Sequence, residues 1–441
     1  MPQHIILFPF PALGHIFPNL ALAVRLCKSL PDLQITLLVT PHNAQRAAVS
    51  AHLLSRLRIG IVEDGLPEGQ GGTDNLPRLA GATEGPVMRQ SFTTLVAEAA
   101  IPVTAIVSDV FLGWTGSVAR DLGIPRFILY TPPAQVMNLM LSLGPAITSG
   151  YFDPSSVNHL SPIPLHGGLP PVERRDLPSH LHDPSAFMFT FFVRASAAII
   201  NNCDGILLNT FEAFEPSAIA AVRNNPNLPS TRIWSVGPVL DVESDTATVP
   251  ADPHGCLPFL AIQPPRSTLL ISFGSIAVLS PPQVAELARA LLSSTIPFIW
   301  SLRGDGLPPG FEEATRGRGL VVPFCPQVDI LAHPATSVFL SHCGWNACLE
   351  AVSAGVPILA MPCFAEQRMN AGFLVRDGYG VECERDADGM VEAERFTRLW
   401  GDTALIEKLR GRSVVAAEEA RRAVLPRGSS AEGLALFVQS L

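Results

Sequence analysis

The sequence predicts an α/β protein with two domains, each built on a doubly wound parallel sheet. Short apolar runs alternate with helical patterns along the chain, and this alternation implies parallel strands joined by crossover helices. A polar run with several prolines divides the 441 residues near position 240, and each part is long enough for its own core. We therefore predict an N-terminal domain at 1–240, a linker at 241–255, a C-terminal domain at 256–426 and a terminal helical segment at 427–441.

Composition favours a compact globular protein. Hydrophobic residues make up 47 % of the chain and charged residues 16 %, which leaves little sequence of the disordered type. The net charge of −9 argues against nucleic acid or an anionic membrane as the main partner. Prolines interrupt the first apolar run and no apolar stretch could span a bilayer, so we expect neither a secretory signal nor stable membrane insertion. The eight cysteines form no CxxC pair, so we expect reduced thiols in a cytoplasmic protein. We also expect a monomer.

In the N-terminal domain, strands are predicted at the short apolar runs 5–8, 35–39, 106–107, 126–129 and 205–209. Pro9–Phe17 is predicted to be a loop, and Pro18 to open a helix that runs to Ser29, because proline suits a first helical position. Further helices are predicted at 114–121, 187–200 and 212–223. The segment between 40 and 105 has weak periodicity and is assigned only helices and loops, and 151–184 is predicted to be a long surface loop.

In the C-terminal domain, the same reasoning places strands at 268–272, 298–300, 320–322, 338–340 and 357–360. Helices are predicted at 281–292, 396–409, 413–424 and 431–441. Ser280 and Pro281 begin the first of these helices, whose apolar stripe contains Val284, Leu287, Ala288, Leu291 and Leu292.

The stretch from Phe324 to Gln367 holds the densest set of candidate binding residues. Its strand at 338–340 leads through a turn, which Gly344 is predicted to relieve, into a helix capped by Asn346. A helix that follows a strand directly aims its N–H groups and positive dipole end at one point, which suits a phosphate. Many such units bind no ligand, so ordinary packing stays the alternative. The polar end of the stretch follows the next strand, at the sheet edge where open α/β sheets bind ligands.

This stretch resembles the signature segment of the plant family-1 UDP-glycosyltransferases. The likeness spans its whole length and includes Pro326-Gln327, His333-Pro334, His342-Cys343-Gly344-Trp345-Asn346, Glu350 and Glu366-Gln367. Shorter matches extend over nearly the whole chain. The resemblance implies the GT-B fold, in which two Rossmann-like doubly wound domains face each other across a cleft, with a final helix that crosses back to the N-terminal domain. It also implies an enzyme that uses a UDP-sugar as co-substrate and needs neither a cofactor nor a metal.

The resemblance assigns the nucleoside to four positions. Phe324 would stack on uracil and Gln327 would touch the base, with Cys325 between them, while Glu350 would hold the ribose hydroxyls. The family usually has tryptophan at the first of these positions. The smaller phenylalanine ring is therefore expected to weaken donor binding without changing the donor.

The resemblance assigns the diphosphate and the sugar to neighbouring segments. His342, Asn346 and the Ser275 loop would meet the diphosphate. Ala347 stands where the family usually has serine, so it would offer only its backbone N–H. The sugar, expected to be glucose, would meet the remaining three positions, Trp345, Glu366 and Gln367.

His15 and Asp109 are the predicted catalytic pair. Each follows a strand of the N-terminal domain, and Asp109 could reach one ring nitrogen of His15 and fix its tautomer. A lone histidine is more often structural, but Gly14 gives the backbone freedom to direct the ring. The resemblance makes His15 the general base and Asp109 its orienting partner. It also places Gly14 and Thr131 near the donor sugar, although an ordinary turn residue is an equal interpretation of Thr131.

The implied reaction moves the sugar, with inversion, to a hydroxyl of a small aromatic acceptor. Arg175–Pro178 and Pro297–Arg303 resemble the flavonoid 3-O-glucosyltransferase branch, so a flavonoid or other phenolic is expected. A terpenoid, a hormone or a simple phenol is the alternative. The apolar residues expected to line the acceptor pocket, or equally to belong to the core, are Phe10, Phe17, Phe111, Met137 and Phe187.

Other functional classes fit the sequence less well. Ala351–Gly355 approaches the nucleophile elbow of a serine hydrolase, but Ser353 falls late in a helix. A dehydrogenase would need three glycines after its first strand, where Pro9–His15 has one. A UDP-binding protein without turnover is a further alternative. Asp386-Ala387-Asp388 could hold a metal beside a diphosphate, but a solvated turn is the better interpretation.

Overall fold

The protein consists of two α/β units. The computed structural model describes residues 3–45, 47, 56–201, 203–240, 252–304 and 306–441. One unit comprises Met1–Val249 together with Arg422–Leu441, and the other comprises Pro250–Arg421. Most of the predicted linker, residues 241–251, lies outside the described residues. Among the helices that the structure describes, none combines the length and the apolar character needed to cross a bilayer.

The first unit is built on a seven-stranded parallel sheet with the order β3-β2-β1-β4-β5-β6-β7. The direction of winding reverses between β1 and β4, where Phe8 lies beside Ser108. Open α/β sheets bind ligands beyond the carboxyl ends of the strands at such a reversal. The strands are β1 (His4–Phe8), β2 (Gln34–Val39), β3 (Leu57–Ile61), β4 (Ala105–Ser108), β5 (Arg126–Tyr130), β6 (Gly205–Leu208) and β7 (Arg232–Ser235).

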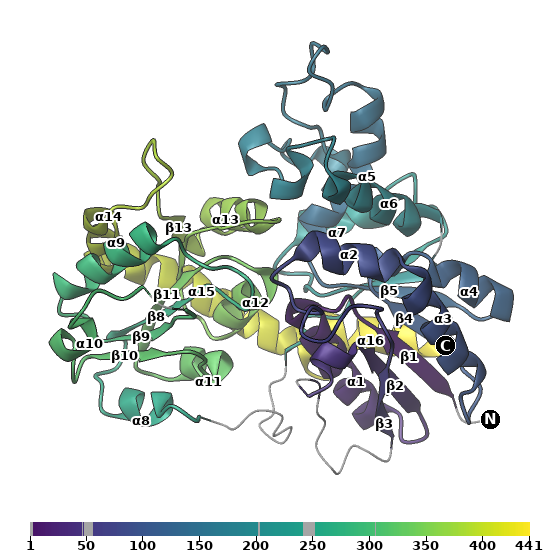
Figure 1. Cartoon of the computed structure of the whole chain (residues 1–441), viewed down its shortest axis with the longest axis horizontal. Helices are drawn as coiled ribbons and strands as arrows, with labels where there is room; N and C mark the ends of the chain where they lie inside the picture. The colour runs from purple at the N-terminus through teal and green to yellow at the C-terminus, as the bar shows by residue number, and fades with distance from the viewer. Residues whose placement is uncertain (1–2, 46, 48–55, 202, 241–251, 305) are drawn as a thin grey trace. The chain divides into compact units, whose positions relative to one another are not determined.

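Helices cover both faces of this sheet (Figure 1). Ile5 and Leu7 of β1 pack in one apolar cluster with α1, whereas Ile6 and Phe8 pack in another with α3 and α4. This alternation follows from the two-residue side-chain period of a strand, and it explains why β1 is apolar from Ile5 to Phe8. The helices are α1 (Leu13–Ser29), α2 (Leu76–Glu84), α3 (Pro86–Ala97), α4 (Thr115–Leu122), α5 (Ala134–Thr148), α6 (Phe187–Asn201) and α7 (Pro216–Arg223).

The second unit is built on a six-stranded parallel sheet with the order β10-β9-β8-β11-β12-β13. Its winding reverses between β8 and β11, where Ser272 lies beside Ser341. The strands are β8 (Thr268–Ser272), β9 (Phe298–Ser301), β10 (Gly319–Val322), β11 (Thr336–Ser341), β12 (Ile358–Ala360) and β13 (Gly380–Glu382). The helices are α8 (Cys256–Ala261), α9 (Pro281–Leu292), α10 (Phe311–Ala314), α11 (Gln327–Ala332), α12 (Trp345–Ser353), α13 (Gln367–Arg376) and α14 (Ala393–Gly401).

Helix α9 shows how closely the sequence pattern describes this unit. Ser280 caps it, its hydroxyl accepting a hydrogen bond from the backbone N–H of Gln283. The predicted stripe is buried from Val284 to Leu291, but Leu292 is 42 % exposed because it is the last residue of the helix and points away from the core.

The end of the chain differs from the prediction in one helix boundary. Two helices were predicted at 396–409 and 413–424 and two are found, but the break falls at Asp402, between α14 and α15 (Thr403–Val424), and not after Leu409. Helix α16 (Ser429–Gln439) belongs to the first unit, where it packs on β7. Phe437 of α16 is buried, with its ring centroid 5.0 Å from that of Phe127 and 5.7 Å from that of Trp234.

Candidate functional site

The predicted catalytic pair lies at the reversal point of the first sheet. Asp109 follows β4, and His15 lies in the first turn of α1, the helix that follows β1. Nδ1 of His15 is 2.6 Å from Oδ2 of Asp109. Because an ionised carboxylate only accepts hydrogen bonds, Nδ1 donates and Nε2 keeps the lone pair. The side chain of His15 is 19 % exposed and that of Asp109 only 1 %, so a reachable base is oriented by a buried carboxylate.

The structure corrects the local prediction around His15. Helix α1 begins at Leu13 and not at Pro18, so His15 and Gly14 are helical rather than part of a loop. The N–H groups of His15 and Ile16 both donate to the carbonyl of Ala12. Helix α1 continues through Pro18, although an interior proline has no backbone N–H to donate to the carbonyl four residues earlier. The ring of His15 is therefore directed by a rigid helix start, not by the backbone freedom expected of Gly14.

Arg126 is a supporting residue that sequence reasoning missed. Its guanidinium donates to the Asp109 carbonyl at 3.2 Å, to the Ser108 hydroxyl at 2.9 Å and to the Thr115 hydroxyl at 3.0 Å. Burial lowers the pKa of Arg126 to about 10, so it remains positively charged behind the Asp109 carboxylate. The sequence could have indicated this role, because Arg126 is a charged residue at the start of β5, a strand that is buried along its whole length. Thr131, predicted to bond the sugar, has its hydroxyl 3.1 Å from Nδ1 of His15.

Phenylalanine rings surround His15. The ring centroid of Phe10 lies 5.5 Å, and that of Phe111 5.9 Å, from the imidazole. Phe191 and Phe192 of α6 contact Phe111 in turn, at 5.2 Å and 4.9 Å. The sequence predicted Phe10 and Phe111 as lining residues but not Phe191 and Phe192. The helical periodicity of α6 does not show which neighbouring segment its aromatic face contacts.

The other predicted lining residues divide between surface and core. Phe17 and Phe187 are 41 % and 44 % exposed. Met137 is completely buried in the cluster that α5 forms with β5 and β6, so it belongs to the core and not to a pocket.

Several of the predicted donor residues follow the carboxyl ends of three adjacent strands of the second unit, whereas Phe324, Cys325 and Gln327 follow β10 at the edge of the same sheet. The pairing of β8 with β11 and of β11 with β12 places Ser272, Ser341 and Ala360 in one row across the sheet. The segments that carry Ser275, His342 and Gln367 leave the sheet from this row. The sequence motifs are therefore brought to one edge, at the reversal point of this sheet as well.

The ring of His342 occupies a cradle between two glycines. A Cβ atom at Gly274 would lie 2.6 Å from Nε2 of His342, and one at Gly344 would lie 2.5 Å from it. Gly344 was predicted to relieve the turn, but its φ of −61° is open to any residue. The residue with positive φ is Cys343, at 63°, whose carbonyl accepts a hydrogen bond from Asn370. Gly344 is thus needed for close approach to the histidine and not for backbone freedom.

The surroundings of this cradle suit an anion. The guanidinium of Arg303 donates to the carbonyls of Ser275 and Ala277 and fastens the loop after β8. Burial lowers the pKa of His342 to about 4, so its ring is neutral at pH 7 and can donate one N–H. The N-terminus of α12 points its positive end here, and its cap residue, Gly344, has no side chain to bond the first N–H groups. Asn346, the predicted cap, is the second residue of α12, because the cap is Gly344 and the helix begins two residues earlier than expected.

Gln327 and Glu350 form a polar pair beside an exposed ring. Nε2 of Gln327 donates to Oε2 of Glu350 at 2.6 Å. Burial raises the pKa of Glu350 to about 7, an effect that the hydrogen bond from Gln327 partly opposes. Phe324 is 47 % exposed, which leaves its ring able to stack on a planar base. Burial raises the pKa of Cys325 to about 12, so this thiol packs as a neutral group.

The residues predicted to contact the sugar differ in how accessible their side chains are. The resemblance assigns Trp345 to the sugar, but its ring is buried against Phe373 of α13, so the indole face is not open to a sugar. Oε1 of Gln367 accepts hydrogen bonds from the N–H groups of Cys363 and Phe364, which fixes the orientation of the amide. Glu366 immediately precedes α13 and is partly exposed, whereas Ala347 is buried in the first turn of α12.

Asp386 and Asp388 form the predicted turn. Oδ1 of Asp386 accepts hydrogen bonds from the N–H groups of Asp388 and Met390, at 3.0 Å and 2.8 Å. Within the described ranges, no three histidine, cysteine, aspartate or glutamate side chains gather as metal ligands do.

The chain resembles known glycosyltransferases over its whole length. The family described as UDP-glucoronosyl and UDP-glucosyl transferase matches residues 195–393. A malvidin galactosylase of Oryza sativa subsp. japonica is 32 % identical over 97 % of this chain and 95 % of its own. An indole-3-acetate beta-glucosyltransferase of Zea mays is 32 % identical over 100 % of this chain and 98 % of its own. The structure of Phytolacca americana UGT2 complexed with UDP-2fluoro-glucose and pterostilbene has a TM-score of 0.83 at 27 % identity and covers 100 % of this chain and 99 % of its own. The chain therefore belongs to the plant family-1 UDP-glycosyltransferases, GT-B enzymes that transfer a glycosyl group from a UDP-sugar to a small acceptor.

Proposed function

We propose that this enzyme transfers glucose from UDP-glucose to a hydroxyl of a small phenolic acceptor, such as a flavonoid, with inversion at the anomeric carbon. The observation that carries the proposal is the 2.6 Å contact between Nδ1 of His15 and the buried carboxylate of Asp109. In the proposed reaction Nε2 of His15 takes the proton of the acceptor hydroxyl as its oxygen attacks the anomeric carbon. Such a proton transfer typically contributes about 10²- to 10⁴-fold to the rate.

The proposed donor contacts follow the geometry of the second unit. Phe324 stacks on uracil, Glu350 accepts hydrogen bonds from the ribose hydroxyls, and Gln327 orients this carboxylate. The leaving diphosphate is stabilised by the positive start of α12 and by an N–H of His342. These two groups provide the electrostatic stabilisation that a metal ion would otherwise supply.

The aromatic surroundings of His15 support a phenolic acceptor. Phe10 and Phe111 flank the imidazole, and an aromatic acceptor would pack against these rings edge to face or offset. The Phytolacca americana structure contains pterostilbene, whereas the Zea mays relative is named for indole-3-acetate. A flavonoid is our choice, and terpenoid, hormone and simple phenol acceptors are the alternatives that the experiment distinguishes.

Incubation with UDP-glucose and a panel of acceptors, followed by mass spectrometry, tests this proposal. We expect phenolic glucosides as the main products and none with His15→Ala, the matched control. Main products from terpenoids or from indole-3-acetate would overturn the acceptor class while leaving the enzyme class intact.

The donor sugar needs its own comparison, because one relative is named a galactosylase. Gln367 is the terminal residue of the donor segment, and its amide is oriented by two backbone hydrogen bonds. We expect UDP-glucose to give a higher kcat/KM than UDP-galactose. The opposite preference would refute the assignment of glucose.

A further inference from the structure

A cavity in the first unit lies away from the catalytic pair. Its volume is about 350 Å³, and it opens along the second half of α5, between Leu141 and Ser149. Thr131, whose hydroxyl touches His15, precedes this helix. At 1.5 Å per residue, the cavity spans roughly 10 to 22 Å along the helix from its first residue. The cavity is therefore a separate site and not an extension of the imidazole's surroundings.

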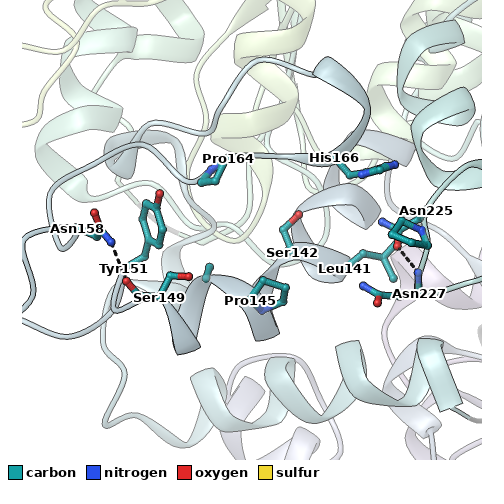
Figure 2. A pocket seen from close by; sticks show the side chains of 12 residues that line it. Leu141, Ser142, Pro145, Ser149, Tyr151, Asn158, Pro164, His166, Asn225 and Asn227 are labelled. Carbon is teal, nitrogen blue, oxygen red and sulfur yellow. Dashed lines mark hydrogen bonds between the residues drawn. The ribbon is translucent and has the colours of Figure 1, made fainter.

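The walls of the cavity come from three parts of the chain (Figure 2). Ser142 and Pro145 belong to α5. The long loop that follows this helix contributes Tyr151, Asn158, Pro164 and His166. Asn225 and Asn227, in the turn after α7, close the other side. No arginine, lysine, aspartate or glutamate is among the residues that line it in the described chain. A phosphate or carboxylate bound here would lack a counter-charge, so the site fits a neutral ligand.

Asn225 is the clearest sign of a ligand. The residue is 96 % buried, being 4 % exposed, yet its side chain lines the cavity. Its Oδ1 accepts a hydrogen bond from the N–H of Asn227 at 3.0 Å, which fixes the orientation of the amide. Its Nδ2 has no hydrogen-bond partner among the described residues, although an amide nitrogen carries two donors. This nitrogen is not fully enclosed by protein and faces the open cavity, where a water or a bound hydroxyl can accept its hydrogen bonds.

The other polar groups supply a mixture of acceptors and donors. Nδ2 of Asn158 donates to the Ser149 carbonyl at 2.9 Å, which leaves its Oδ1 as an acceptor. Nε2 of His166 contacts the Asn224 carbonyl at 3.1 Å, so in the neutral ring Nδ1 is an acceptor. The Ser142 hydroxyl donates to the Asn138 carbonyl at 2.8 Å and can still accept. Tyr151 adds a hydroxyl and a flat ring, and Pro145, Pro164 and Pro226 add flat apolar faces.

We propose that this cavity binds the neutral sugar of a glycoside. Sugar hydroxyls both donate and accept, which matches the alternating amide, hydroxyl and imidazole groups, and the apolar C–H face of a pyranose matches Tyr151 and the prolines. The volume lies within the roughly 300–1,000 Å³ of small-molecule sites. The inference does not depend on the proposed acceptor or donor of the catalytic reaction, since a glycoside of any origin carries this group.

Ligand-observed NMR with the full chain and saturating UDP tests the site, with methyl β-glucoside and the neutral phenyl β-glucoside as probes. We expect both to bind with Kd on the order of millimolar, and Asn225→Ala and Tyr151→Leu each to weaken binding by about fivefold or more. Asn224→Ala, a change in the neighbouring exposed side chain, is the matched control and should bind as the wild type does. Thermal melts establish that each variant is folded, and turnover without added glycoside should be unchanged.

Three results would overturn the inference. The first is equal binding by wild type, Asn225→Ala and Tyr151→Leu, which would place the glycoside elsewhere. The second is absence of binding of both neutral glucosides to the wild type. The third is binding of phenyl glucuronide at least as tight as that of phenyl glucoside, which would contradict a site without counter-charge.

Discussion

The pH dependence of nucleoside binding tests the role of Glu350 in detail. Burial raises the pKa of this carboxyl to about 7, and the ribose hydroxyls are proposed to donate to its ionised form. With a pKa near 7, the ionised fraction falls about tenfold between about pH 8 and pH 6. We therefore expect the affinity for uridine to weaken about tenfold over this range as the pH falls. Uridine is the right ligand because UDP carries a phosphate that itself titrates near pH 6.

Isothermal titration of wild type and Glu350→Gln with uridine measures this effect. The variant keeps the shape of the side chain but does not titrate, so its affinity should be weaker and independent of pH. The same shift also acts on stability. A raised pKa favours the folded state below the ordinary value of 4.5, and this contribution is lost as the pH rises through about 7. A wild-type affinity that is flat from pH 6 to pH 8 would refute the reasoning.

Three substitutions test other parts of the account. Gly344→Ala places a Cβ 2.5 Å from Nε2 of His342, so the imidazole ring must shift. We expect the free energy of unfolding to fall by about 1–3 kcal/mol and UDP to bind about tenfold more weakly. A wild-type affinity for UDP, measured by calorimetry, would contradict the role of the two glycines in holding the ring. Phe324→Trp enlarges the half-exposed ring and should tighten UDP, whereas an unchanged Kd would mean that uracil does not stack there. Phe437→Ala empties the core between α16 and β7 and should cost about 3–5 kcal/mol in denaturant unfolding, and a loss below about 1 kcal/mol would show that α16 is not anchored by this ring.

The sequence pattern predicted the central strands well but missed the edges of the first sheet. Central strands such as β1 are buried on both faces and read as continuous apolar runs. Strands β3 and β7 lie at the two edges, and each carries an exposed arginine, Arg58 and Arg232, which hides the strand pattern. Helix α5 was missed because Gly144 and Pro145 interrupt a segment that is otherwise apolar on most sides.

The candidate site shows the same division. His15 and Asp109 could be paired from the sequence, because each follows a strand and those strands are neighbours in a doubly wound sheet. The cradle around His342 could not be predicted, since Gly274 and Gly344 are far apart in sequence and meet only through the register of β8 with β11. Trp345 could be assigned to the donor segment from the motif, but a motif does not show that its ring packs inward against Phe373.

The central claim is that His15 acts as the general base and does not hold the nucleotide. Measuring kcat and the Kd of UDP on the same preparation of His15→Ala tests it most directly. We expect the variant to have a kcat lower by at least about 10²-fold and a Kd for UDP within about twofold of wild type. A variant that keeps wild-type turnover, or one that loses UDP binding together with activity, would contradict it.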